Sequence, residues 1–121
     1  MPLSYLLDEH FRGLFHRHIQ RYNARNEHKI DAVRVGDPQD LPLGTSDQDI
    51  LIWAEREERI LISLDGRTLP AHLAAHLAAG HHSPGVMLVR QVTFREVVEF
   101  LAIAAHASEP SEWSDRITFI P

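Results

Sequence analysis

The chain has 121 residues, and its composition, 44% hydrophobic and 24% charged, is typical of a folded globular domain and excludes a disordered chain. It contains no cysteine, which excludes disulfides, cysteine-ligated zinc and thiol catalysis. The formal net charge of −5 excludes a uniformly basic surface, and no apolar run approaches the ~20 residues of a membrane span. We expect a single domain over residues 1–121, located in the cytoplasm because no signal peptide begins the chain.

Hydrophobic periodicity predicts strands and helices that alternate along the chain. The run from Ile60 to Leu64 is continuously apolar, as in a central strand buried on both faces. The segment from Thr93 to His106 repeats apolar residues at helical spacing and is the clearest amphipathic helix. In chain order we expect a strand over 3–7, a helix over 10–23, a strand over 29–35, a loop over 36–44, a helix starting at Thr45-Ser46-Asp47, a strand over 60–64, a helix over 68–79, a strand over 85–89, a helix over 93–106, a polar linker over 108–114 and a strand over 116–120.

This alternation predicts an α/β fold, a three-layer α/β/α sandwich with a mainly parallel central sheet. Right-handed crossovers place the carboxyl ends of all parallel strands at one edge of the sheet. Ligands of such sheets bind outside that edge. The residues that directly follow the strands are therefore the first candidates for a functional site.

Three aspartates are candidates for such a site. Asp8 directly follows the first predicted strand, Asp65 follows the strand over 60–64, and Asp47 lies where the next helix begins. Neighbouring strands are roughly 4.8 Å apart, so carboxylates at their ends can share a cation, and Mg²⁺ prefers oxygen ligands. Each aspartate also has a purely structural interpretation, because Asp8 and Asp47 stand at helix N-cap positions and Asp65-Gly66 is a common turn pair.

Four segments together resemble one known family. Asp47 to Ala54 has the pattern D-x-x-I-x-x-x-A, and Ile60 to Asp65 is an apolar strand that ends on an acid. The segment Leu6 to His10 reads LLDEH, and Pro84 to Arg90 reads PGVMLVR. In these segments the chain resembles the PIN-like nucleases, in particular a short branch often labelled a domain of unknown function. The resemblance covers roughly residues 3–90.

The resemblance implies a Mg²⁺- or Mn²⁺-dependent ribonuclease, commonly the toxin half of a toxin–antitoxin pair. It assigns the catalytic and metal-binding roles to Asp8, Asp47 and Asp65. The implied partners are an RNA substrate, a cognate antitoxin protein and a second copy of the chain, with no membrane. Arg12, Arg17 and Arg21 would then contact the phosphate backbone if their helix borders the groove.

The chain also departs from the family pattern. His10 stands where asparagine is usual, Ser63 where threonine is usual, and Asp65-Gly66-Arg67-Thr68 lacks a further acid of the family's D-x-D-F ending. The alternative function is therefore a catalytically weak or inactive PIN-like subunit that binds a protein partner. In that case Trp53 and Trp113 would be exposed interface anchors.

A signalling role and a zinc site are also compatible with particular residues. A receiver-like signalling domain would have acids after its first strand and an aspartate where Asp65 stands, but it needs a late lysine and Lys29 is the only lysine. His72 and His76 are spaced four residues apart, with His81 and His82 just beyond, and this spacing can bind zinc. We interpret these histidines as a solvated polar stripe.

Overall fold

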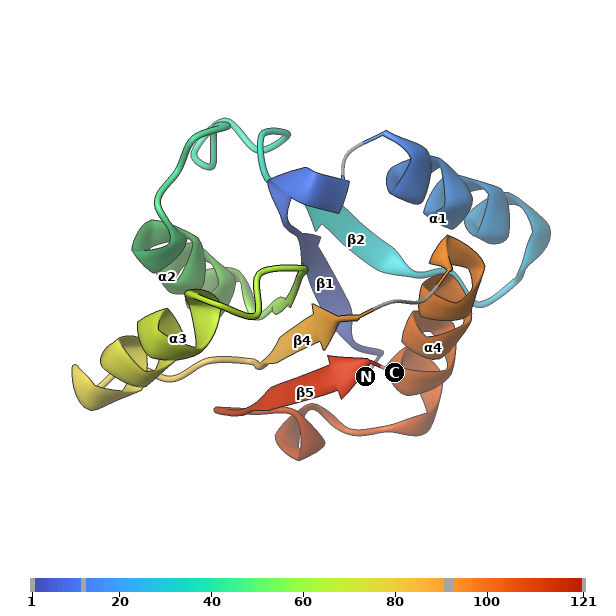
Figure 1. Cartoon of the computed structure of the whole chain (residues 1–121). Coiled ribbons are helices and arrows are strands. Elements are labelled where there is room, and N and C mark those ends of the chain that lie inside the picture. Colours follow the sequence, from blue (N-terminus) through green and yellow to red (C-terminus); the bar gives the residue numbers. More distant parts are fainter. Residues whose placement is uncertain (1, 12, 91–92, 121) are drawn as a thin grey trace.

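The computed structural model describes residues 2–11, 13–90 and 93–120, and their fold is built on one five-stranded, fully parallel sheet (Figure 1). The strand order is β2-β1-β3-β4-β5. The elements are β1 (Ser4–Leu7), η1 (Glu9–Phe11), α1 (Leu14–Arg25), β2 (Asp31–Arg34), α2 (Asp47–Glu57), β3 (Ile60–Ser63), α3 (Leu69–Ala78), β4 (Val86–Val89), α4 (Phe94–Ala107), η2 (Pro110–Glu112) and β5 (Ile117–Ile120). The predicted α/β class with a parallel sheet is confirmed.

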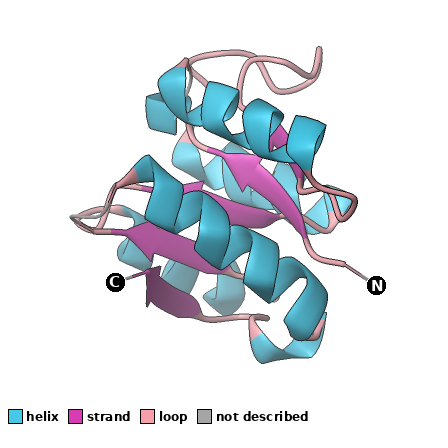
Figure 2. Ribbon diagram, turned by 90° about the vertical axis from the view of Figure 1, so that its right-hand side faces the viewer, coloured by secondary structure: helices cyan, strands magenta, loops and turns pink. Residues whose placement is uncertain are grey.

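Helices cover both faces of the sheet, an arrangement compatible with a three-layer sandwich. Helices α1 and α4 lie on one face, and α2 and α3 lie on the other (Figure 1). Figure 2, seen from the side of α1 and α4, shows these two helices in front of the sheet. Because a parallel sheet needs a crossover between successive strands, the connecting helices supply both covering layers.

Successive strand residues point to opposite faces and divide the apolar interior into two clusters. On β3, Ile60 and Ile62 pack in the cluster under α1 and α4, whereas Leu61 packs in the cluster under α2 and α3. The residues of β4 divide in the same way, and all four residues of β3 and of β4 are buried. The continuously apolar sequence of these strands therefore reflects burial on both faces, as predicted.

Tyr5 is fully buried and connects β1 to α4. Its hydroxyl donates a hydrogen bond to the carbonyl oxygen of Leu101 at 2.7 Å. Burial raises the pKa of the Tyr5 hydroxyl well above its usual range. The neutral phenol therefore satisfies its polar atom inside the core without carrying charge.

Several predicted boundaries differ from those of the structure, two of them next to predicted site residues. The helix predicted over 10–23 begins only at Leu14, because Gly13 has a φ of 82° and separates α1 from the short helix η1. Phe11 on η1 packs into the core, which explains why its segment followed the apolar pattern. The strand predicted over 60–64 ends at Ser63, and Leu64 is 47% exposed.

The two tryptophans are packed within the fold, which removes the support for their role as exposed interface anchors. Trp53 is buried, and its indole N–H donates to Asp40. Trp113 is half-buried against the core, and its indole N–H donates to the Ser108 hydroxyl at 2.8 Å. The alternative of a partner-binding subunit therefore gains nothing from these side chains.

None of the described helices is both long enough and apolar enough to cross a membrane.

Substitution of Leu101 by alanine should destabilise the fold strongly, because Leu101 is fully buried on the inner face of α4. We expect a loss of about 2–5 kcal/mol in the free energy of unfolding, measured by urea denaturation. Ile103→Ala on the same helix is the matched control, since Ile103 is 68% exposed, and its effect should stay within about 0.5 kcal/mol. Equal losses in the two variants would contradict the assigned orientation of α4.

Candidate functional site

Asp8 and Asp65 lie at the carboxyl edge of neighbouring strands. Strands β1 and β3 pair in parallel, with Leu7 opposite Ile62, and the backbone N–H of Asp8 donates to the Ile62 carbonyl at 3.0 Å. The chain passes from β1 to β2 on one side and returns to β3 on the other, so this edge is the switch point of the sheet. Ligands of open α/β sheets bind at such a point.

The buried hydroxyl of Ser63 connects the two aspartates. It donates to Asp8 Oδ2 at 2.6 Å and accepts the backbone N–H of Asp65 at 3.0 Å. Ser63 is 1% exposed, so an unpaired hydroxyl there would be costly. The sequence identified Ser63 only as a replacement for threonine, and its contact with Asp8 crosses between strands, which no local pattern reveals.

The side chain of Asp8 is held by a second partner, His10. Asp8 Oδ1 lies 3.0 Å from His10 Nδ1 and also accepts the backbone N–H of His10 at 3.2 Å. The side chain of Asp8 is 17% exposed and that of His10 is 66% exposed. An imidazole therefore reaches solvent directly beside the Asp8 carboxylate.

Asp65 organises the turn that starts α3. Its carboxylate accepts the backbone N–H groups of Arg67 and Thr68, both at 3.0 Å, and the hydroxyl of Thr68. The Thr68 hydroxyl bond is the largest cause that lowers the pKa of Asp65, followed by the Thr68 backbone bond, and the charge of His10 lowers it less. Asp65 therefore has the structural role in a turn that the sequence suggested for Asp65-Gly66. Its charged carboxylate is nevertheless partly exposed.

Asp47 is the first residue of α2 and not its N-cap. Ser46 caps the helix, and its hydroxyl accepts the backbone N–H of Asp49. Asp47 Oδ2 instead lies 3.6 Å from Nε2 of His72 on α3. Since α3 begins just after Asp65, this contact brings Asp47 toward the same edge from the neighbouring helix.

The three predicted aspartates do not form a tight ligand set by themselves. Within the described part of the chain, only Glu55, His76 and His81 bring three metal-ligand atoms within 4.8 Å of one another. A cation shared by Asp8, Asp47 and Asp65 would therefore be held partly through water, which is how Mg²⁺ is usually bound.

Two of the three arginines predicted to meet phosphate, Arg17 and Arg21, lie on α1. Arg17 and Arg21 are exposed, and Arg21 lies with Arg25 and Arg95 in a groove between α1 and α4. Arg12 lies outside the described residues. The basic groove is therefore on the α1–α4 side of the sheet, while Asp47 and α2 lie on the other.

One predicted histidine is not part of a solvated stripe. The side chain of His76 is 1% exposed and lies 3.2 Å from Glu55, whereas His81 and His82 are exposed. Glu55, whose pKa is lowered chiefly by the backbone N–H of His82, was not a candidate from the sequence. No motif joins Glu55 to His76, because only the packing of α2 on α3 brings them together.

The receiver-like interpretation requires a lysine beside Asp65, and Lys29 does not meet this need. Lys29 precedes β2 and therefore lies at the amino edge of the sheet, opposite Asp65. Its ammonium group donates to the carbonyl oxygens of Asn23 and Asn26 at the end of α1. Lys29 therefore binds the end of α1 and lies away from the acidic edge.

Comparisons of the chain with protein-family models, with curated proteins and with solved structures found no match. The function is therefore inferred from the site and from the sequence motifs.

Thr68→Val should raise the pKa of Asp65 toward its ordinary value, because it removes the main hydrogen bond to the charged carboxylate. The measurement is an NMR titration of the Asp65 carboxyl carbon. A lowered pKa in the folded state stabilises the protein above the unfolded-state value, and this stability is lost as the pH falls through the folded-state pKa. The stability difference between wild type and variant should therefore shrink below pH ~4.

Thr45→Val is the control for this titration, because the Thr45 hydroxyl donates to the Pro42 carbonyl and not to a carboxylate. It should leave the Asp65 titration unchanged. An unchanged Asp65 pKa in Thr68→Val would refute the assigned hydrogen bond.

Proposed function

We propose that this protein is a Mg²⁺- or Mn²⁺-dependent ribonuclease whose site lies at the carboxyl edge of β1 and β3. One observation carries the proposal: Asp8 and Asp65 leave neighbouring parallel strands at the switch point, and the buried Ser63 hydroxyl contacts Asp8 and the Asp65 backbone. Asp47 is the third acid, on the helix packed against α3.

The chemistry of the donor set fits a hard cation. The candidate donors are carboxylate oxygens, which Mg²⁺ and Mn²⁺ prefer. Each carboxylate oxygen has two acceptor positions, so the hydrogen bonds to Asp8 and Asp65 leave lone pairs free for a metal. Because Mg²⁺ retains several waters, two or three acids are sufficient to hold it.

When bound, the cation would polarise the scissile phosphate and lower the pKa of a bound water. The residues of the chain would supply the positioning. Ser63 and the backbone of His10 hold the Asp8 carboxylate in one orientation. Because His10 Nδ1 faces Asp8, the exposed imidazole can also donate from Nε2 to a phosphate oxygen only in its protonated form. His72 lies 3.6 Å from Asp47 and, when protonated, would attract its carboxylate.

The substrate class and the partner follow from charge and from the family resemblance. Arg17 and Arg21 are exposed on α1, which follows Asp8 and η1 along the chain, and their charge suits a phosphate backbone. The similarity of Asp47 to Ala54 and of the LLDEH segment to PIN-like nucleases supports a toxin that cleaves RNA and is held by an antitoxin protein. A second copy of the chain is the other candidate partner.

Purified protein should cleave single-stranded RNA in the presence of Mn²⁺, and chelation by EDTA should abolish the cleavage. Asp8→Asn and Asp65→Asn should each reduce the rate by at least about 100-fold, because each removes a charged ligand from the metal site. The rate is measured on a fluorescently labelled RNA, and circular dichroism verifies that each variant is folded.

Asp49→Asn is the matched control for Asp47→Asn, because Asp49 is an exposed acid on the same helix. Only the Asp47 variant should lose activity. Cleavage that persists in both Asp8→Asn and Asp65→Asn would place the reaction elsewhere. Absence of cleavage in wild-type protein with Mn²⁺ would favour the inactive, partner-binding alternative.

A further inference from the structure

We propose that Glu55, His76 and His81 form a second metal site that binds Zn²⁺, at the edge of the sheet opposite the aspartates. Glu55 lies near the end of α2, His76 near the end of α3, and His81 just after α3. Both helices run back from the carboxyl edge, so their ends meet at the amino edge. The proposal does not depend on the ribonuclease function.

The distances between the donor atoms match those of a metal site. Glu55 Oε1 lies 3.2 Å from His76 Nε2 and 3.2 Å from His81 Nδ1. Two ligands of a tetrahedral zinc ion with bonds of 2.0–2.1 Å are separated by roughly 3.3 Å. All three donor atoms lie within 4.8 Å of one another. The three donor atoms are therefore close enough to share one zinc ion.

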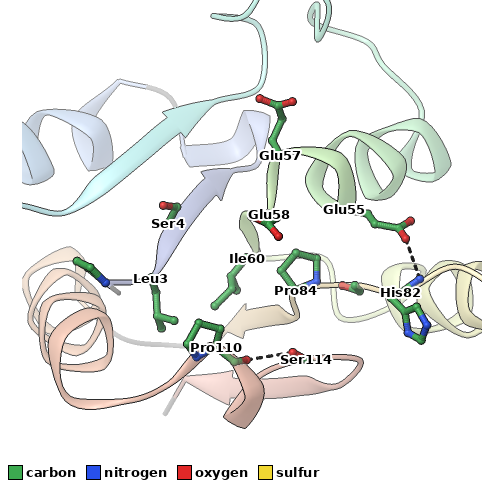
Figure 3. A pocket seen from close by; sticks show the side chains of 12 residues that line it. Leu3, Ser4, Glu55, Glu57, Glu58, Ile60, His82, Pro84, Pro110 and Ser114 are labelled. Atoms are coloured by element: carbon green, nitrogen blue, oxygen red, sulfur yellow. Dashed lines mark hydrogen bonds between the residues drawn. The ribbon is translucent and has the colours of Figure 1, made fainter.

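The carboxylate of Glu55 is oriented by a backbone contact. Its Oε2 accepts the backbone N–H of His82 at 3.0 Å, which leaves Oε1 facing the two imidazoles. Figure 3 shows Glu55 and His82 joined by this bond. Both residues line a hollow of about 490 Å³. Glu57 and Glu58 also line the hollow and add negative charge on the side of Glu55, which favours a cation nearby.

The buried His76 provides a fixed ligand and His81 a movable one. His76 Nε2 also lies 2.8 Å from the carbonyl oxygen of His82, and this hydrogen bond must be released before Nε2 can bind a metal. The imidazole rings of His76 and His81 are stacked, with their centroids 4.7 Å apart and their planes at 15°. A metal ion lies in the plane of each imidazole that binds it, so one of the two rings must turn before both can bind the same ion. The side chain of His81 is 46% exposed, so it has room to turn.

The ligand types select the metal. Two imidazoles and one carboxylate suit Zn²⁺ and other transition ions and not Mg²⁺, which prefers oxygen ligands. Three protein ligands leave the fourth tetrahedral position for water. The two edges of the sheet therefore differ in metal preference, and their metal sites can be tested separately.

The test is isothermal titration of ZnCl₂ into the full chain, free of any polyhistidine tag and of metal. Wild-type protein should bind one equivalent saturably, and His81→Ala and Glu55→Gln should each weaken binding by about 10-fold or more. His81 is exposed, so its variant is expected to fold, and Co²⁺ bound in place of Zn²⁺ should show the intense visible absorption of a tetrahedral site. MgCl₂ should show no binding that depends on Glu55.

His72→Ala is the matched control, since His72 lies on the same helix outside the ligand group. It should leave Zn²⁺ binding unchanged, as should Asp8→Asn and Asp65→Asn. The proposal is overturned by a lack of saturable Zn²⁺ binding in wild type, or by binding that survives both His81→Ala and Glu55→Gln. It is also overturned if His72→Ala weakens binding as much as they do, which would indicate a diffuse histidine-rich surface.

Discussion

Burial of both faces of the parallel sheet is the constraint on which the rest of this structure depends. Strands β3 and β4 are buried along their whole length, so apolar helices must cover each face. Each crossover between parallel strands supplies one such helix. The pairs α1–α4 and α2–α3 follow from this requirement, and so does the separation of the molecule into a carboxyl edge and an amino edge.

The two edges of the sheet carry different side chains, because strands end at one edge whereas α2 and α3 end at the other. At the carboxyl edge, strands end and helices begin, which favours short acidic side chains that accept backbone N–H groups, as Asp65 does from Arg67 and Thr68. At the amino edge, α2 and α3 end side by side, and longer side chains such as Glu55 and His76 meet between them. Aspartates that follow strands therefore mark one edge, and a group of one glutamate and two histidines forms at the other.

Buried polar side chains fix the geometry of the candidate sites at both edges of the sheet. Ser63 and His76 are among the few buried polar residues, and each is satisfied by a partner from a different element: Asp8 for Ser63, and Glu55 together with the His82 carbonyl for His76. An unpaired polar atom in either position would cost free energy, so each contact fixes the geometry of its neighbours. The same contacts that stabilise the fold thus orient the carboxylates of the two candidate sites.

The sequence by itself determined the succession of strands and helices and the location of Asp8 and Asp65 at one edge. Both follow from local patterns: apolar periodicity marks each element, and a parallel order of strands places their ends together. The break at Gly13 is not evident from the sequence because Phe11, which precedes it, is apolar and buried without being part of α1.

Contacts between elements were decided only by the tertiary structure. His72 meets Asp47, and Glu55 meets His76 and His81, because α2 packs against α3, and no periodicity within either helix encodes which of its side chains will face the other.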